Sequence, residues 1–268
     1  MLNEITDLPN GGRIPAMHLS NTRDLGGLKT IDGRRILPCH LLRSGKLYQL
    51  CPEDISLLTD QYHLQTVIDL RTKKEQLNEP DTQISGVHII SNPILEDNWL
   101  GISRDKNLLD MLLDFDGDAE MYMEKCYREL VLNDHTQHHY SMFIHYILEQ
   151  ENGAILWHCS AGKDRAGIAA ALLLTLLGVP QNTVLEDYMR TNFFLKDKLS
   201  GQLARMKIRG VSQKALSNIQ TMLSVRESYL EGAFEAIHQQ YQTMDSYFHT
   251  ALGLTPEEIK ALQDKYLF

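Results

Sequence analysis

One cysteine and one arginine near the middle of the chain have a spacing that suits phosphoryl transfer. Cys159 lies six positions before Arg165, after an apolar stretch typical of a strand and before an apolar helix. A cysteine attacks phosphorus only as a thiolate, so the anion has to be stabilised. A tight loop that leads into a helix N-terminus does this, because its backbone N–H groups converge on an anion. We therefore expect Cys159 to be a nucleophile in an anion-binding loop.

The residues between these two fit a loop that surrounds a phosphate group. Gly162 allows a turn that a Cβ would block. The planar guanidinium of Arg165 suits bidentate contact with phosphate oxygens in the ground state and in the transition state. We expect His158 to hold a neighbouring carbonyl group and to support the thiolate. The residues expected to bind substrate phosphate or inorganic phosphate are Ser160, Ala161, Gly162, Lys163, Asp164 and Arg165.

Lys163 has two interpretations. As a point charge at the rim of the pocket it would favour inositol-type or multiply phosphorylated head groups as well as phosphotyrosine. As an ordinary exposed lysine it would have no role.

The other cysteines and the histidines do not form a recognisable metal-binding pattern. Four cysteines are present, at positions 39, 51, 126 and 159, and none is in a paired CxxC spacing. We expect no metal and no cofactor, and a reducing compartment in which the thiols stay free.

Composition limits the classes of partner and the location. The chain has 268 residues, 43% of them hydrophobic, and a formal net charge of −9. That charge argues against general affinity for nucleic acid or anionic membranes. The N-terminus lacks the pattern of a signal peptide and the apolar run 169–177 is too short to cross a bilayer, so we expect a cytoplasmic protein without stable membrane insertion.

The order of predicted elements indicates an α/β fold. Strands are predicted at 65–70, 87–91 and 154–158, with a hairpin at 28–36 and helices near 52 and at 164–177. Because strands and helices alternate, the sheet should be largely parallel. Residues 181–268 should be almost wholly helical, with segments at 183–192, 212–225, 227–241 and 255–266. We expect a single domain over residues 1–268.

A long helical stretch precedes the strand that carries the cysteine. Part of it, about 104–135, could form a lid with a hinge at 110–118. The alternative is that the helices simply cover one face of the sheet, which we favour for the portion after Tyr140.

Four motifs in order give the chain a family resemblance. They are Asn21-Thr-Arg-Asp-Leu-Gly-Gly27, Leu42-Arg-Ser-Gly-Lys-Leu47, Ile68-Asp-Leu-Arg71 with Glu75, Pro80 and Asp81, and the loop that contains Cys159. Together they resemble the bacterial tyrosine/lipid phosphatase family. The resemblance implies a protein-tyrosine-phosphatase-like fold, a parallel-centred sheet flanked by helices. It also implies metal-independent hydrolysis of phosphomonoesters through a phosphocysteine, with phosphotyrosine, phosphoserine or phosphothreonine in proteins, or phosphoinositides, as substrates.

The general acid that protonates the leaving oxygen has several candidates. Asp164 is the leading one, because it lies in the loop beside the arginine. It could equally be structural, either as a helix cap that accepts backbone N–H bonds or as a partner of Arg23. Asp97, Asp116 and Asp118 are the alternatives that could swing over the site.

Residues outside the loop are expected to support it. Asn21, Arg23 and Asp24 lie in a glycine-terminated loop, where Asp24 would orient Arg23 or the phosphate loop. Lys46 could reach substrate and so could Arg43, although solvated surface charge is the commoner outcome for such residues.

One departure from the family pattern keeps other functions open. Ala166 stands where related phosphatases have serine or threonine, so Ser160 or a water would have to stabilise the departing thiolate. The alternatives are a phospho-binding pseudophosphatase and a sulfurtransferase or arsenate reductase. An arsenate reductase would need a resolving cysteine, for which Cys126 is the candidate.

Overall fold

The computed structural model describes residues 12–96, 115 and 117–268. Within these residues a five-stranded sheet has the order β1-β2-β5-β3-β4. Strands β2 (Leu41–Ser44), β5 (Ala154–His158), β3 (Leu64–Asp69) and β4 (His88–Ser91) are parallel, and β1 (Arg23–Asp24) pairs antiparallel with β2. The predicted parallel-centred α/β fold is therefore confirmed.

The central strand β5 sets the position of the site. All five of its residues are buried, as expected for a parallel strand covered on both faces. His158 at its end is in register with Ser44 of β2 and with Asp69 of β3. The carboxyl ends of three strands thus meet where the sequence leaves β5 for the Cys159 loop.

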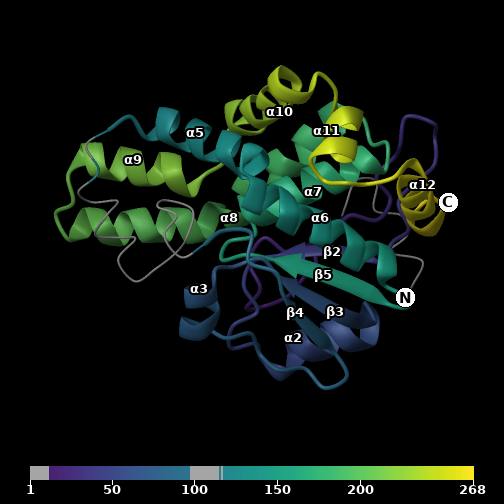
Figure 1. The fold of residues 1–268 in the computed structure, drawn as a ribbon. Helices are drawn as coiled ribbons and strands as arrows, with labels where there is room; N and C mark the ends of the chain where they lie inside the picture. Colours follow the sequence, from purple (N-terminus) through teal and green to yellow (C-terminus); the bar gives the residue numbers. More distant parts are fainter. Residues whose placement is uncertain (1–11, 97–114, 116) are drawn as a thin grey trace.

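Helices cover both faces of the sheet (Figure 1). On one face lie α6 (Asp134–Glu149) and α7 (Arg165–Leu176), and the Phe143 ring of α6 packs edge-on against Trp157 at 5.3 Å. On the other lies α2 (Pro52–Ser56), followed by the short turn η1 (Leu57–Gln61), while α3 (Lys73–Asn78) follows β3. The portion after Tyr140 covers the sheet, as we favoured.

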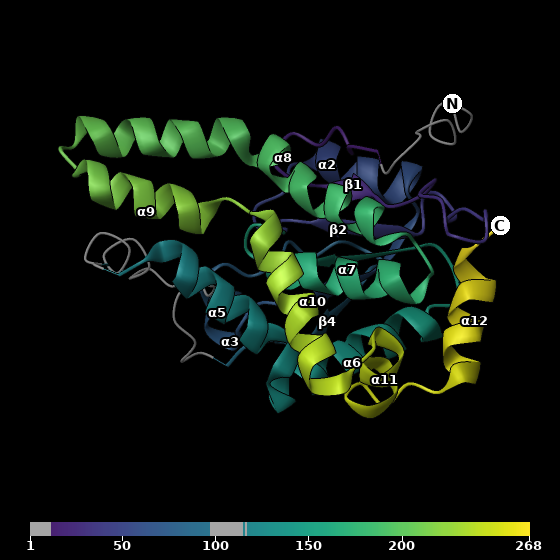
Figure 2. The ribbon, with the colours of Figure 1, turned by 90° about the horizontal axis from the view of Figure 1, so that it is seen from above.

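Residues 181–268 are almost wholly helical, as predicted. They contain α8 (Gln181–Ile208), α9 (Gln213–Leu223), α10 (Glu227–Tyr241), α11 (Met244–Thr250) and α12 (Pro256–Tyr266). Helices α8 and α9 form an antiparallel hairpin that projects from the rest of the molecule (Figure 2). At the C-terminal end, Leu37 donates its N–H to the Tyr266 carbonyl at 2.8 Å, so the last helix is tied to the N-terminal segment.

The structure describes only part of the predicted lid. Residues 104–114 and 116 lie outside the described residues, as does Asp97. Helix α5 (Ala119–Leu132) buries Met123, Tyr127 and Leu130 and packs on α10. Whether any part of 104–135 moves as a lid stays a prediction.

Two local predictions differ from the structure in extent. The predicted helix 183–192 is part of the much longer α8. The predicted hairpin at 28–36 has a single antiparallel bridge, Lys29 to Arg35, with Gly33 at φ +94° in its turn. No helix of the described chain combines the length and apolar character needed to cross a bilayer.

Candidate active site

The Cys159 loop connects the end of β5 to the start of α7. Gly162 in this loop has φ +65°, and a Cβ there would lie 2.4 Å from the Ser44 carbonyl oxygen. Glycine is therefore required for both conformation and space. Cys159 exposes 2% of its surface, so the sulfur lies at the base of the site.

Arg165 is fixed by the carboxylate of Glu75, which belongs to the third motif but had no predicted role. Its Nη1 donates to Glu75 Oε2 at 2.6 Å and its Nη2 to Glu75 Oε1 at 3.1 Å. Burial opposes the charged guanidinium, but the Glu75 carboxylate raises the pKa of Arg165, which is therefore always charged. Glu75 is placed by a capping box with Thr72 at the start of α3. That local signal indicates a helix start and says nothing about a partner 90 residues away.

Asp164 is held by a chain of hydroxyl groups. Its Oδ1 accepts from the Tyr127 hydroxyl at 2.7 Å, and Tyr127 in turn accepts from the Tyr188 hydroxyl at 2.8 Å. Burial raises the pKa of each tyrosine hydroxyl well above the usual value, so both hydroxyl groups remain protonated and can donate. Asp164 stands in the N-cap position of α7, but its side chain makes no capping hydrogen bond. The proposed pairing of Asp164 with Arg23 is wrong, because Arg23 pairs with Asp187.

Lys163 corresponds to neither interpretation offered for it. Its side chain is 2% exposed, and its Nζ donates to Asp164 Oδ1 at 2.6 Å and to the Met222 carbonyl at 3.0 Å. The ammonium thus faces the end of α9, where a cation is favoured by the helix dipole. It is not an exposed lysine, and its charge is already paired.

Two buried arginines and one aspartate support the back of the loop. Asp187 of α8 accepts from Arg23 Nε at 2.7 Å and from Arg43 Nη1 at 2.8 Å. Arg43 Nη2 also donates to the Gly162 carbonyl at 2.8 Å. Burial raises the pKa of Asp187, but the two arginines outweigh it and the pKa is lowered. The expectation that Arg43 is surface charge is wrong, since it is 0% exposed, and Asp187 was missed because no local pattern marks it.

Asn21 binds the same part of the loop as Arg43. Its Nδ2 donates to the carbonyls of Ala161 at 3.1 Å and Gly162 at 2.8 Å, and its Oδ1 accepts from Arg23 at 2.6 Å. The Asp24 carboxylate instead accepts from the N–H groups of Gly26 and Cys39, at 2.8 and 2.7 Å. Asp24 therefore orders its own turn, and the role expected for it toward Arg23 or the phosphate loop is wrong.

Lys46 approaches the loop through its backbone. Its N–H donates to the Ser160 carbonyl at 3.5 Å, whereas its ammonium pairs with Glu79. The side chain is thus directed to a surface carboxylate.

His158 lies in a buried ionic cluster beneath the loop. Its Nε2 is 2.8 Å from Asp81 Oδ2 and its Nδ1 is 3.3 Å from the Cys159 carbonyl, the type of contact expected for it. Burial lowers the pKa of His158, but Asp69 and Asp81 outweigh this effect and raise it. Arg71 completes the cluster, donating to Asp69 at 2.7 Å and to Asp81 at 2.8 Å.

Comparison with known proteins decides the family. A model described as "Tyrosine phosphatase family" matches residues 14–268. The chain belongs to the tyrosine phosphatase family. It is a cysteine-dependent phosphatase, as the resemblance of its motifs implied.

Relatives of this phosphatase carry consistent names. A protein of Cupriavidus necator, named as a predicted tyrosine-protein phosphatase, is 30% identical over 93% of this chain and 86% of its own. The triple specificity protein phosphatase PtpB of Mycobacterium tuberculosis is 24% identical over 86% of this chain and 91% of its own. Among solved structures, P. aeruginosa TpbA aligns with 16% identity over 71% of this chain and 89% of that chain. Its TM-score of 0.29 is too low to support an argument.

The phosphatase differs from the usual loop at Ala166, whose side chain is fully buried and has no hydroxyl. The Ser160 hydroxyl donates to Glu75 and lies 3.2 Å from Arg165 Nη2, so it is directed to that ion pair. Burial raises the pKa of the Cys126 thiol to about 11, which makes it a poor resolving nucleophile. The arsenate reductase alternative therefore gains no support.

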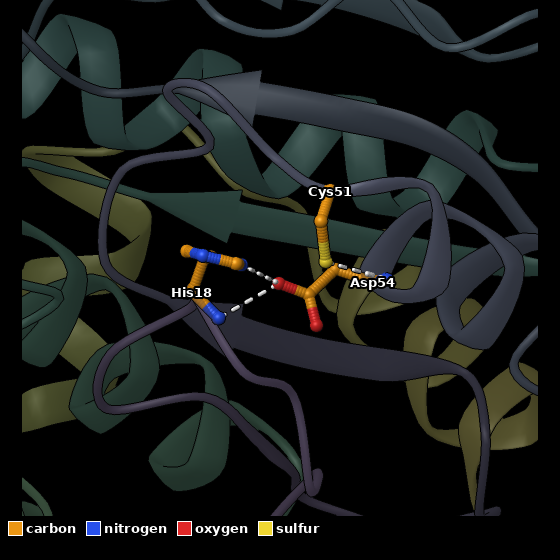
Figure 3. A group of neighbouring side chains, drawn as sticks. All are labelled: His18, Cys51 and Asp54. Atoms are coloured by element: carbon orange, nitrogen blue, oxygen red, sulfur yellow. Dashed lines mark hydrogen bonds and ion pairs between the residues drawn. The ribbon is translucent and has the colours of Figure 1, made fainter.

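Two groups in the described part of the phosphatase have side chains of metal-ligand type. One is Asp69, Asp81 and His158, where Arg71 supplies the positive charge. The other is His18, Cys51 and Asp54 (Figure 3). There the Asp54 carboxylate accepts the N–H groups of Met17 and His18, at 2.7 and 2.8 Å, and the Cys51 sulfur accepts the Asp54 N–H at 3.4 Å. These bonds tie the segment before Asn21 to α2, and the expected absence of a metal site stays a prediction.

Proposed function

We propose that the phosphatase hydrolyses phosphotyrosine in proteins, without a metal, through a phosphocysteine at Cys159. The sulfur attacks phosphorus in line as the bond to the tyrosine oxygen breaks, and that oxygen takes a proton from Asp164. Water then attacks the phosphocysteine, returns a proton to Asp164 and releases inorganic phosphate and the thiolate. This proposal rests on one loop that carries the nucleophile, the arginine and a carboxylic acid.

Arg165 is assigned to the equatorial oxygens of the transferring phosphoryl group. Its two contacts with Glu75 fix the plane of the guanidinium before substrate arrives. A donor that needs no reorientation stabilises the transition state more than a flexible one. Glu75 is therefore a positioning residue.

Asp164 is assigned as the proton donor and acceptor. Its Oδ1 already accepts from Tyr127 and Lys163, so we assign the exchanged proton to Oδ2. The observation that carries the proposal is this double anchoring, which fixes the carboxyl group five residues from Cys159 in the same loop. Asp97 and Asp116 lie outside the described residues. Asp118 instead caps α5, accepting from the N–H groups of Glu120 and Met121.

Phosphotyrosine is the substrate class that the site favours. A sulfur this deeply placed is reached most readily by a phosphate carried at the end of an aromatic ring. A cavity of about 10 Å³ beside Ala161 is lined by Leu195, Lys198, Leu199 and Gln202 of α8 and by Leu223 of α9. Phosphoinositides lose support, because the Lys163 charge that would have favoured them is already paired.

The four cysteines are free in the structure, which agrees with the reducing cytoplasm that we propose as the site of action.

The test is steady-state hydrolysis of a phosphotyrosine peptide, a phosphoserine peptide and a phosphoinositide panel, with EDTA present. We expect the phosphotyrosine peptide to be hydrolysed with the highest kcat/KM and Cys159→Ser to be inactive on every substrate. Turnover that requires a divalent metal would refute the mechanism. A higher kcat/KM for a phosphoinositide would refute the substrate assignment alone.

A further inference from the structure

The turn that joins α8 to α9 concentrates positive charge in an acidic protein. We call residues 205–214 the hairpin tip. It contains four basic residues and no acidic residue, whereas the whole chain has a net charge of −9. All four are exposed: Arg205, Lys207, Arg209 and Lys214.

An apolar side chain lies among these charges. Ile208 is 86% exposed, the largest value for the exposed large hydrophobic residues of the described chain. It lies directly between Lys207 and Arg209 and at the last position of α8. An isolated exposed isoleucine needs no explanation, but one that follows and precedes exposed basic residues has the composition of an interfacial membrane contact.

The tip is placed where it can present the active site to a surface. The arrowhead of strand β5 points toward the side of the molecule on which α8 and α9 project (Figure 1). Closer to the body of the molecule, Leu199 of the same helix lines the cavity beside Ala161. A surface that binds the tip would therefore lie on the side to which the phosphate loop opens.

We propose that the hairpin tip binds bilayers that contain anionic lipid, with Arg205, Lys207 and Arg209 at the head groups and Ile208 in the interfacial layer. The whole-chain charge argued against affinity for anionic membranes. The helical hairpin changes that conclusion, because it projects from the rest of the molecule and carries Arg205, Lys207 and Arg209 at the end of α8 (Figure 2). A nucleic acid would complement the positive charges of the tip but would not bury the exposed Ile208 side chain in an apolar layer.

This contact goes beyond the proposed function and does not depend on it, since no tip residue belongs to the catalytic loop. An inactive Cys159→Ser protein should bind vesicles as the wild type does. Failure of either proposal can thus be recognised separately.

Co-sedimentation with vesicles of phosphatidylcholine, with and without phosphatidylserine, tests the proposal. We expect binding only when phosphatidylserine is present, and weaker binding as salt concentration rises. Lys207→Gln/Arg209→Gln should reduce the partition coefficient about tenfold or more. The matched control is Lys29→Gln/Lys260→Gln, which makes the same change in net charge at exposed positions elsewhere and should bind as the wild type does.

Ile208→Ser separates a bilayer contact from a purely electrostatic one. The proposal expects several-fold weaker vesicle binding by this variant, with hydrolysis of p-nitrophenyl phosphate unchanged in solution. Equal loss in the control pair, no effect of Ile208→Ser, or preferential binding to an oligonucleotide over phosphatidylserine vesicles would each overturn it.

Discussion

Arg43 and Arg165 are both fully buried and both contact the phosphate loop, but they do so from opposite directions. Arg43 donates to the Gly162 carbonyl and is paired with Asp187. Arg165 belongs to the loop itself, and Glu75 holds its guanidinium. The first arginine binds the outside of the loop, and the second is available to the anion inside it.

The difference indicates how the loop that we propose as the phosphate site is given its shape. The C=O and N–H of one trans peptide unit point in opposite directions. Because Asn21 and Arg43 hold the Ala161 and Gly162 carbonyls on one side of the loop, the N–H groups of Gly162 and Lys163 point to the other side. The shape of the loop therefore depends on the contacts of Arg43, and we assign the chemistry of the loop to Arg165. The four predictions below separate these two contributions.

The largest effect is expected for Arg165→Lys. Lysine keeps the charge but loses the planar fork, so kcat toward p-nitrophenyl phosphate should fall about a thousandfold. The matched substitution Arg43→Lys should change kcat by less than about tenfold and should mainly lower stability. Comparable losses of kcat in the two variants would remove the distinction.

Asp187→Asn leaves two buried guanidinium groups without their shared carboxylate. We expect the free energy of unfolding at pH 7 to fall by about 3 kcal/mol, measured by urea denaturation. Asp197→Asn, an exposed position of the same helix, should change it by less than about 0.5 kcal/mol. Similar values for the two would show that Asp187 does not hold the back of the loop.

His158→Gln should have a smaller, pH-dependent effect on stability. The folded-state pKa of His158 is raised, so its stabilisation is complete below the unfolded pKa of about 6.5 and is lost as pH rises through the folded value. The folded-state pKa of Asp81 is lowered. Asp81 therefore stabilises the fold above its unfolded pKa of about 3.9, and this stabilisation is lost as pH falls through the folded-state pKa.

Between these limits, near pH 5.5, His158→Gln should cost about 2 kcal/mol of unfolding free energy, and less at pH 9. Denaturant titrations of wild type and variant at both pH values measure this. A cost that increases with pH would show that the histidine is buried neutral.

Tyr127→Phe should have the smallest effect. It removes one of the two donors to Asp164 Oδ1, worth about 1 kcal/mol, so kcat should fall about fivefold with KM unchanged and the pH profile of kcat altered. Tyr188→Phe keeps the Tyr127 hydroxyl that contacts Asp164, so it should lower kcat by less than Tyr127→Phe does. A Tyr127→Phe profile identical in shape to the wild type would make the hydroxyl chain merely structural.

The sequence was informative where the signal was local. Strand 154–158 and helix 227–241 have the predicted bounds, and the loop residues follow one another in the chain. Asp187 was missed, and Glu75 was noted in a motif without a role, because their partners lie 144 and 90 residues away and a single sequence does not show such pairing. Lys163 was misjudged for a related reason, since only the fold reveals that the Met222 carbonyl and Asp164 receive its ammonium.

The hairpin tip illustrates a different limit. Net charge is an average over the chain, and it conceals a basic segment that the fold carries away from the acidic body. Composition therefore describes the average charge of the chain and does not reveal the local charge of residues 205–214.

The central claim is that Cys159 carries the phosphoryl group during turnover, and acid quenching of the wild-type enzyme with a phosphotyrosine peptide tests it most directly. We predict that mass spectrometry of the digest finds one phosphoryl group on the peptide that contains Cys159, and none in Cys159→Ser. Rapid turnover with no such adduct, or turnover retained by Cys159→Ser, would contradict the account.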